Sequence, residues 1–164
     1  MINVPSVLIV TDGSIFPNPG TGGWASIVRR KTDSGIMEQI ITGRDENMAT
    51  NITMEMSAVI AGLNSLDRPS DVHLITDLQM IVFGIKQYIP NWVSRGWRNS
   101  HGETPANVGL WKQIYTLTQI HNVTVEWTKG HVGHELNTRA DKLAGKARMG
   151  ELTNTVKFIE GASL

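Results

Sequence analysis

The chain contains no cysteine among its 164 residues, which excludes disulfide bonds and thiolate metal sites. It also lacks any run of about 18 apolar residues, so no transmembrane helix is expected. The first residues carry neither a basic region nor a long apolar core, so we expect no signal peptide. These absences favour a cytoplasmic protein with no membrane partner.

Net charge is absent as well, because 15 basic and 15 acidic residues cancel. Overall charge therefore indicates no polyanionic partner, and any basic surface has to be local. Hydrophobic residues make up 40% of the chain, as in ordinary globular proteins. The length suits one domain, which we place at residues 1–150. The tail at 151–164 contains one strand-like run and is expected to be partly disordered.

The motif Thr-Asp-Gly-Ser at 11–14 follows four apolar residues, 7–10, that predict a buried central strand. A carboxylate at the end of such a strand, here Asp12, is costly unless it is bound, and a metal ion is a usual partner. A second predicted strand, 72–77, also ends in Thr-Asp, and the carboxyl ends of strands are where α/β sheets bind ligands. The alternative for Asp77 is a simple N-cap of the next helix.

Two predicted helices carry further carboxylates. Glu55 lies in the first turn of a helix that Thr50 or Asn51 can cap, on the border of the apolar face formed within 56–63. The alternative for Glu55 is favourable placement near a helix N-terminus. Asp141 similarly borders the apolar stripe of the last helix. The basic residues of that helix are expected to be ordinary solvated side chains: Arg139, Lys142, Lys146 and Arg148.

The segment 86–112 interleaves basic and aromatic residues. This combination suits the phosphates and sugars of a nucleic acid. The alternative is that the aromatics fill a small core. We expect that alternative for Trp111, and a surface position for Tyr88, Arg95 and Arg98.

Two motif-like patterns are rejected. The segment 20–25 fits the dinucleotide pattern Gly-x-Gly-x-x-Ala, but 24–29 predicts a strand where that pattern should open a helix. His131 and His134 suggest zinc, but their spacing does not suit one helical face and no cysteine completes a site. A histidine in this glycine-rich loop is better interpreted as a proton carrier beside the carboxylates.

The predicted order of strands and helices, together with seven short motifs, resembles ribonuclease H type 1, the family that cuts the RNA strand of RNA–DNA hybrids. The motifs lie within about residues 5–150 and are Thr-Asp-Gly-Ser (11–14), Asn-Pro-Gly-x-Gly-Gly (18–23), Thr-Asn-x-x-Met-Glu (50–55), Thr-Asp-x-Gln (76–79), Gly-Trp (96–97), Lys-Gly-His-x-Gly-His (129–134) and Asn-x-x-x-Asp-x-Leu-Ala (137–144). The resemblance implies an α/β fold with a central mixed five-stranded sheet, three strands antiparallel and two parallel, flanked by helices.

The resemblance also implies a catalytic, metal-binding set at Asp12, Glu55, Asp77 and Asp141, with His131 as the mobile histidine. Two Mg²⁺ ions, with Mn²⁺ as a substitute, would support hydrolysis that leaves 5′-phosphate and 3′-hydroxyl ends. The protein is expected to act as a monomer on an RNA–DNA hybrid. The residues expected to contact the hybrid are Asn18, Thr50, Asn51, Gln79, Tyr88, Arg95, Arg98, Asn107 and Asn137.

Two positions depart from the family's pattern. Ile52 stands where relatives often have a second polar amide, and Met48 stands where some have an arginine for a DNA phosphate. The segment 86–107, which resembles the family's basic protrusion and is called the handle below, holds few lysines. Affinity for the hybrid is therefore expected to be modest and salt-sensitive.

Two other functions stay open at this point. One is a DNA-cutting enzyme of the same fold, such as an integrase or junction resolvase; the Lys-Gly-His loop and the handle argue against it. The other is a hybrid-binding module without catalysis, which the presence of all four carboxylates argues against.

Overall fold

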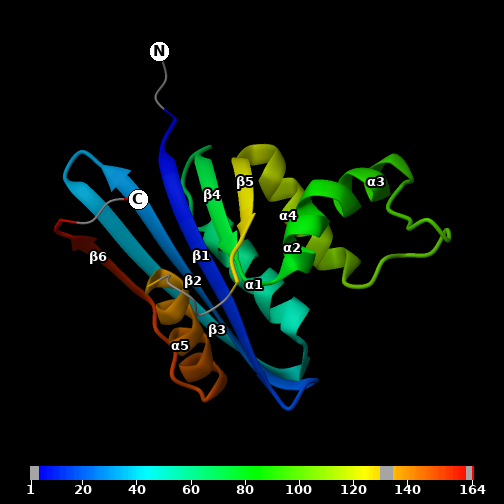
Figure 1. Ribbon diagram of the computed structural model, residues 1–164, viewed down its shortest axis with the longest axis horizontal. Coiled ribbons are helices and arrows are strands. Elements are labelled where there is room, and N and C mark those ends of the chain that lie inside the picture. Colours follow the sequence, from blue (N-terminus) through cyan, green and yellow to red (C-terminus); the bar gives the residue numbers. More distant parts are fainter. Residues whose placement is uncertain (1–3, 130–134, 162–163) are drawn as a thin grey trace.

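The centre of the protein is one sheet of six strands in the order β5-β4-β1-β2-β3-β6 (Figure 1). The computed structural model describes residues 4–129, 135–161 and 164. β1, β2 and β3 form an antiparallel meander, whereas β4 and β5 run parallel to β1, which confirms the predicted mixed sheet. The strands are β1 (Ser6–Phe16), β2 (Gly20–Thr32), β3 (Gly35–Ala49), β4 (Asp71–Thr76), β5 (Asn122–Trp127) and β6 (Thr155–Ile159).

The sheet has one strand more than the five predicted. The strand-like run in the tail belongs to β6, which pairs antiparallel with β3 and places Thr155 opposite Ile40. Just before β6, the Thr153 N–H donates to the Thr42 hydroxyl at 2.7 Å and fixes the tail to β3. The domain boundary at residue 150 and the partial disorder of the tail stay predictions.

Helices cover the sheet on both faces (Figure 1). α1 packs on one face, with α4 against it, and α5 packs on the other. Among the described residues, no helix is both long and apolar enough to cross a bilayer. The helices are α1 (Asn51–Asn64), α2 (Gln79–Phe83), the π-helical turn η1 (Gly84–Tyr88), α3 (Ile89–Ser94), α4 (Val108–Ile120) and α5 (Glu135–Arg148).

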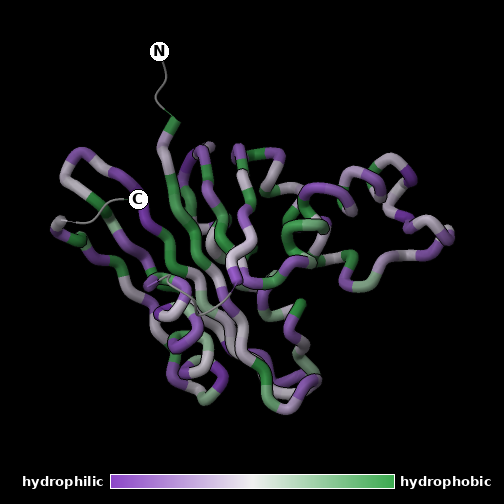
Figure 2. The backbone as a smooth tube through the Cα atoms, viewed as in Figure 1, coloured by the Kyte–Doolittle hydropathy of each residue, from purple (hydrophilic) through white to green (hydrophobic). Residues whose placement is uncertain are grey.

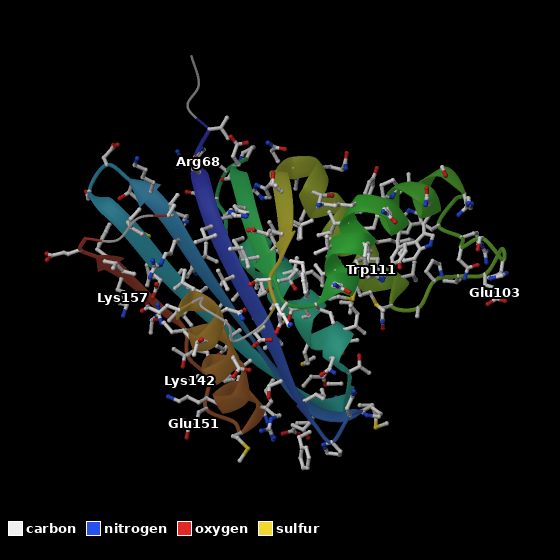
Figure 3. The ribbon with its side chains drawn as sticks, viewed as in Figure 1. Arg68, Glu103, Trp111, Lys142, Glu151 and Lys157 are labelled. Carbon is white, nitrogen blue, oxygen red and sulfur yellow. The ribbon has the colours of Figure 1, made fainter. Side chains whose placement is uncertain are left out.

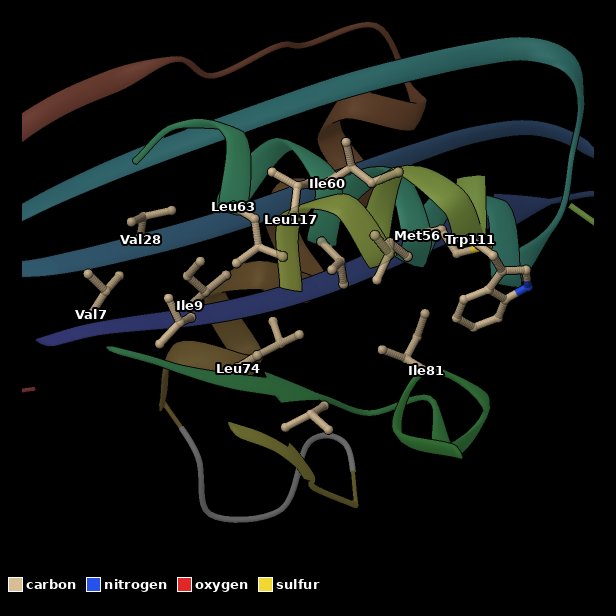
Figure 4. Close-up of a cluster of buried hydrophobic side chains, with 14 of the residues drawn as sticks. Val7, Ile9, Val28, Met56, Ile60, Leu63, Leu74, Ile81, Trp111 and Leu117 are labelled. Carbon is tan, nitrogen blue, oxygen red and sulfur yellow. The ribbon is translucent and has the colours of Figure 1, made fainter. Parts of the chain in front are cut away.

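Side-chain alternation along β1 divides the core into two clusters. Val7 and Ile9 face α1 and α4 in the larger cluster, which Figure 4 shows around Met56, Leu74 and Leu117. Residues of the opposite parity, including Val10, pack with α5 in a smaller cluster. Figure 2 shows that hydrophobic residues are frequent along the central strands.

The handle leaves the body of the protein between α2 and α4, and Glu103 lies near its tip (Figure 3). It begins within the π-helical turn, where the Ile89 N–H donates to the Gly84 carbonyl. Trp111 of α4 is 3% exposed, which confirms its predicted core position. Its ring lies so close to Gly84 that a Cβ there would be 2.1 Å from a ring carbon. The indole therefore anchors the base of the handle to α4.

Candidate active site

The two Thr-Asp pairs lie where the parallel pairing of β1 with β4 ends. β4 ends at Thr76 as predicted, whereas β1 continues beyond its predicted end at Asp12 to Phe16, because it stays paired with β2. Val10 of β1 lies opposite Ile75 of β4, so the next two positions bring Thr11 beside Thr76 and Asp12 beside Asp77. Alternation then directs both threonines toward α1 and both aspartates away from it. The sequence repeat thus becomes two layers at one edge of the sheet, a hydroxyl layer and a carboxylate layer.

Glu55 reaches this edge from the first turns of α1. Thr50 caps the helix, because its hydroxyl accepts from the Thr53 N–H at 3.2 Å while the Thr53 hydroxyl accepts from the Thr50 N–H at 2.9 Å. Gly13 lets the helix approach β1, since a Cβ at this position would lie 2.9 Å from the Met54 Cβ. The glycine of the Thr-Asp-Gly motif therefore brings Glu55 close to Asp12.

Asp12, Glu55 and Asp77 converge as predicted. One carboxylate oxygen from each lies within 4.8 Å of the other two. The three residues line an open cavity of about 240 Å³ together with Gly13, Asn51 and Leu78. Asp77 does not cap a helix, because α2 begins at Gln79 and its N-cap residue is Leu78. The N-cap alternative for Asp77 is therefore wrong.

Burial and mutual repulsion perturb two of these carboxyls strongly. Asp12 is 5% exposed, and burial followed by the charges of Asp77 and Glu55 raises its pKa to about 9. Burial also raises the pKa of Glu55 to about 7, although the Thr11 hydroxyl opposes this rise. Carboxyls so close together cannot all ionise at neutral pH without compensating positive charge.

The donor set fits a hard divalent cation. Its atoms are carboxylate oxygens, which Mg²⁺ prefers, and the open cavity leaves room for the waters that Mg²⁺ retains. Asp12, Glu55 and Asp77 are the residues that would hold it.

Asp141 approaches the cluster from α5, on the carboxylate side of the sheet. Its negative charge contributes to the raised pKa of Asp12, so the two side chains lie close enough for their charges to interact. It is not one of the three residues whose oxygens converge within 4.8 Å. His131 and His134 lie outside the described residues, and the role of His131 stays a prediction.

The prediction that the basic residues of α5 are ordinary solvated side chains is wrong for two of them, Arg139 and Arg148. Arg139 donates to both carboxylate oxygens of the fully buried Glu38 on β3, at 2.7 and 3.0 Å, and Arg29 donates to the same carboxylate at 2.9 Å. Arg148 donates to the Ser14 hydroxyl at 3.0 Å. These bonds hold α5, and with it Asp141, against the strands.

Gly23 brings α5 close to the sheet. A Cβ at this position would lie 2.2 Å from the backbone nitrogen of Arg148 and 2.4 Å from the carbonyl oxygen of Ala144. Gly23, which belongs to β2, therefore serves the packing of α5 on the sheet. The strand that was predicted in place of a dinucleotide-binding helix is confirmed as part of β2.

Two aromatic residues of the handle form a row with Trp111 of α4. Tyr88, 39% exposed, stacks on Trp92 with ring centres 5.7 Å apart, and Trp92 meets Trp111 edge-on at 5.8 Å. Tyr88, Trp92 and Arg95 line a cavity of about 350 Å³. Arg98 is exposed, with its guanidinium 3.3 Å from the Thr104 hydroxyl. The surface positions predicted for Tyr88, Arg95 and Arg98 are confirmed, while their contact with a hybrid stays a prediction.

The other predicted contact residues lie near helix ends or turns. Most are exposed: Asn18 in the β1–β2 turn, Asn51 opening α1, Gln79 opening α2 and Asn107 before α4. Thr50 is half-buried by its capping role. Asn137, in contrast, is fully buried in α5 one turn before Asp141, so its predicted contact with substrate has no exposed surface here.

The two departures from the family's pattern differ in their surroundings. Ile52 packs against the larger hydrophobic cluster, so its side chain contributes to the core. Met48 is 69% exposed and has a left-handed backbone, with φ of 55°. Neither side chain supplies a hydrogen-bond donor for a nucleic acid.

The chain matches the sequence model of RNase H over residues 5–149. It belongs to the RNase H family. A ribonuclease H from Pseudomonas fluorescens is 42% identical over 141 residues, which cover 86% of this chain and 91% of that relative. A type 1 RNase H named LC9-RNase H1 superposes with a TM-score of 0.83 at 24% identity, over 98% of this chain and 80% of that one. A foamy viral protease-reverse transcriptase, solved in complex with an RNA/DNA hybrid, matches with a TM-score of 0.64 at 17% identity, over 90% of this chain and 20% of that chain. These two solved structures support the fold.

Proposed function

We propose that this RNase H family member is an endoribonuclease that hydrolyses the RNA strand of RNA–DNA hybrids and leaves 5′-phosphate and 3′-hydroxyl ends. The observation that carries the proposal is the convergence of Asp12, Glu55 and Asp77 where the parallel pairing of β1 with β4 ends. The carboxylates occupy the positions that the family's motifs specify. Curated relatives that are 40% and 42% identical to this chain carry the name ribonuclease H.

The proposed cofactors are two Mg²⁺ ions, with Mn²⁺ as a substitute. When bound, such ions supply an activated water and offset the charge that develops on the leaving oxygen. Asp12 is the proposed shared ligand because the charges of Asp77, Glu55 and Asp141 all act on it. The Gly13 N–H donates to Asp12 Oδ1 at 2.8 Å and holds that carboxylate in place. Asp77 is held through its backbone, where its carbonyl accepts from the Trp127 indole at 3.0 Å.

We propose His131 as an assisting proton carrier rather than an essential group. A positioned acid–base group contributes roughly 10² to 10⁴-fold to a rate. His131→Ala should therefore slow turnover while leaving Mg²⁺ affinity unchanged, and His134→Ala should have a smaller effect. The opposite ranking of the two variants would show that the loop assignment is wrong.

We propose that the two strands of the hybrid are bound by different parts of the protein: the RNA strand at the carboxylate site and the DNA strand at the handle. RNA differs from DNA by its 2′-hydroxyl and by the shape of the minor groove. Glu55, Asn18 and Gln79 are the proposed reporters of the RNA strand. Tyr88 would stack on a sugar of the DNA strand, and Arg95 and Arg98 would neutralise its phosphates. A monomeric state and a cytoplasmic location stay predictions.

A cleavage assay tests the proposed function against both alternatives. The substrates are one sequence prepared as RNA–DNA hybrid, duplex DNA and duplex RNA, each incubated with and without Mg²⁺. We expect cleavage of the RNA strand of the hybrid alone, and only with the cation. Cleavage of duplex DNA would support an integrase-like or resolvase-like enzyme, and binding without cleavage would support a non-catalytic module.

A further inference from the structure

Two buried hydroxyls converge on one oxygen of Glu55. The Thr11 hydroxyl donates to Glu55 Oε1 at 2.5 Å, and the Thr76 hydroxyl donates to the same oxygen at 2.8 Å. Both threonines are fully buried, and Glu55 itself is 2% exposed. Glu55 therefore accepts one hydrogen bond from β1 and one from β4.

The direction of each hydroxyl is determined by its other neighbours. Thr76 Oγ1 accepts from the Leu78 N–H at 3.1 Å, which leaves its single proton for Glu55. The second acceptor near Thr11, the carbonyl of Ile75, lies farther away at 3.4 Å. Both protons therefore point at Oε1. The bond to Leu78 also fixes the backbone next to Asp77.

These two hydroxyls are not part of the carboxylate set that the family's motifs imply. We propose that Thr11 and Thr76 are positioning residues that hold Glu55 Oε1, so that Oε2 is presented to a cation shared with Asp12 and Asp77. The inference rests on the proposed function. Partners that orient a metal ligand from outside typically change metal affinity or activity by about 10 to 100-fold when they are removed.

The chain offers a matched control in Ser26. It lies opposite Thr11 in the β1–β2 pairing and is also fully buried, but its hydroxyl has no hydrogen-bond partner within the described parts of the chain. Ser26→Ala removes a buried hydroxyl from the same layer without touching Glu55. Any general effect of changing polarity in this layer should therefore appear in that variant as well.

The test measures cation binding directly by calorimetric titration of Mg²⁺ and Mn²⁺ into folded, substrate-free protein. Thr11→Val and Thr76→Val keep the side-chain shape and remove the donor, and each should weaken cation affinity by about 10-fold or more. Thr11→Ser and Thr76→Ser retain a hydroxyl and should bind nearly as tightly as the wild type. Ser26→Ala should be indistinguishable from the wild type. Thermal unfolding checks that each variant is folded at the titration temperature.

Hybrid cleavage by the wild type, measured in parallel, separates the two proposals. If the wild type cleaves and binds cations but the valine variants bind equally well, the hydroxyls only satisfy a buried carboxylate and the positioning role is wrong. If the serine variants are as weak as the valine variants, packing rather than the hydroxyl is responsible and the inference also fails. A wild type that cleaves the hybrid but binds no cation in the substrate-free titration would overturn the positioning role alone, whereas a wild type that neither cleaves nor binds a cation would overturn the proposed function as well.

Discussion

Arg139 of α5 donates to both carboxylate oxygens of Glu38 on β3, although the two residues are 101 positions apart in the chain. Arg29 completes the group, and these hydrogen bonds and charges keep the pKa of Glu38 below its ordinary value even though burial opposes this. The pair ties the helix that carries Asp141 to the sheet that carries Asp12. The ion pair therefore both stabilises the fold and fixes the position of Asp141 relative to Asp12.

Glu38→Gln should destabilise the fold and slow cleavage. The change leaves two arginines beside a neutral amide, and breaking a buried ion pair costs about 3 kcal/mol. Urea unfolding measures the loss of stability, and kcat on a hybrid reports the displacement of α5. Asp67→Asn is the control, because it breaks an exposed pair with Arg68 and should change neither quantity appreciably. Equal effects of the two changes would contradict this interpretation of Glu38.

Asp12→Asn should abolish cleavage while leaving hybrid binding largely intact. The loss of a central metal ligand should raise the barrier by several kcal/mol, so turnover should fall far below a tenth of the wild-type value. The same change should raise the melting temperature of the metal-free protein, because it removes a charge that Asp77 and Glu55 repel. Single-turnover cleavage, a binding titration and thermal unfolding check the three parts. Turnover above about a tenth of the wild type would refute the assignment of Asp12.

The stability of the metal-free protein should fall as pH rises from about 4 to 9. In the folded protein the pKa of Asp12 is raised from 3.8 to about 9 and that of Glu55 from 4.5 to about 7. Between the unfolded and folded values the folded state binds more protons, so raising the pH favours unfolding. Saturating Mg²⁺ should flatten this dependence, because the cation stabilises the ionised carboxylates. Unfolding free energies measured across this pH range, with Mg²⁺ or with a chelator, test the sign, and a rise in stability with pH in the chelator series would contradict it.

The handle should determine affinity rather than chemistry. Replacing Arg95 and Arg98 together with Ala should raise KM, leave kcat nearly unchanged and reduce the slope of log KM against log salt by roughly one to two units. Tyr88→Ala should raise KM without changing the slope, because a stacked ring releases no counterions. KM measured on one hybrid at several salt concentrations distinguishes the two classes. A wild-type slope in the double variant would place the basic contact outside the handle, and the exposed Lys142 (Figure 3) and Lys146 would then be the next residues to replace.

Gly23→Ala should destabilise the protein by about 1–3 kcal/mol, because the new methyl group meets the backbone of α5. Gly145→Ala in α5 is the matched control. Its Cβ would have no neighbour within 4 Å, and alanine in a helix interior is favoured over glycine by about 0.5–1 kcal/mol. Denaturant unfolding should therefore show opposite signs for the two substitutions. A neutral Gly23→Ala would mean that α5 can move away from β2.

Local patterns in the sequence predicted the strands and the neighbouring carboxylates Asp12 and Asp77, whereas the inclusion of Glu55 rested on the resemblance to ribonuclease H type 1. The apolar runs define buried strands, and the Thr-Asp pair that follows two of these runs brings its carboxylates together where the parallel pairing of β1 with β4 ends. The fourth carboxylate, Asp141, was placed on the right helix by its position beside the apolar stripe. The distance of Asp141 from the other three carboxylates depends on how α5 packs on the sheet, and local sequence patterns do not predict that packing.

The missed features all depend on partners far apart in the chain. Periodicity assigned Arg139 to a solvated face, since nothing near it in sequence reveals the buried Glu38. The hydroxyl partners of Glu55 were missed for the same reason, although the threonine shared by both strand ends was a visible signal. β6 was recognised only as a strand-like run, because pairing with β3 requires knowledge of which sheet edge is open.

The pairing of β1 with β4 makes the site depend on residue parity. One residue inserted within β4 would exchange the faces of Thr76 and Asp77, so that a carboxylate would enter the buried layer and a hydroxyl would face the cavity. An insertion of the same size in the connection between α1 and β4 would leave both side chains where they are. The chain can therefore vary in length around its catalytic strands, but the number of residues between the start of the β1–β4 pairing and the two aspartates is fixed by the chemistry of the site.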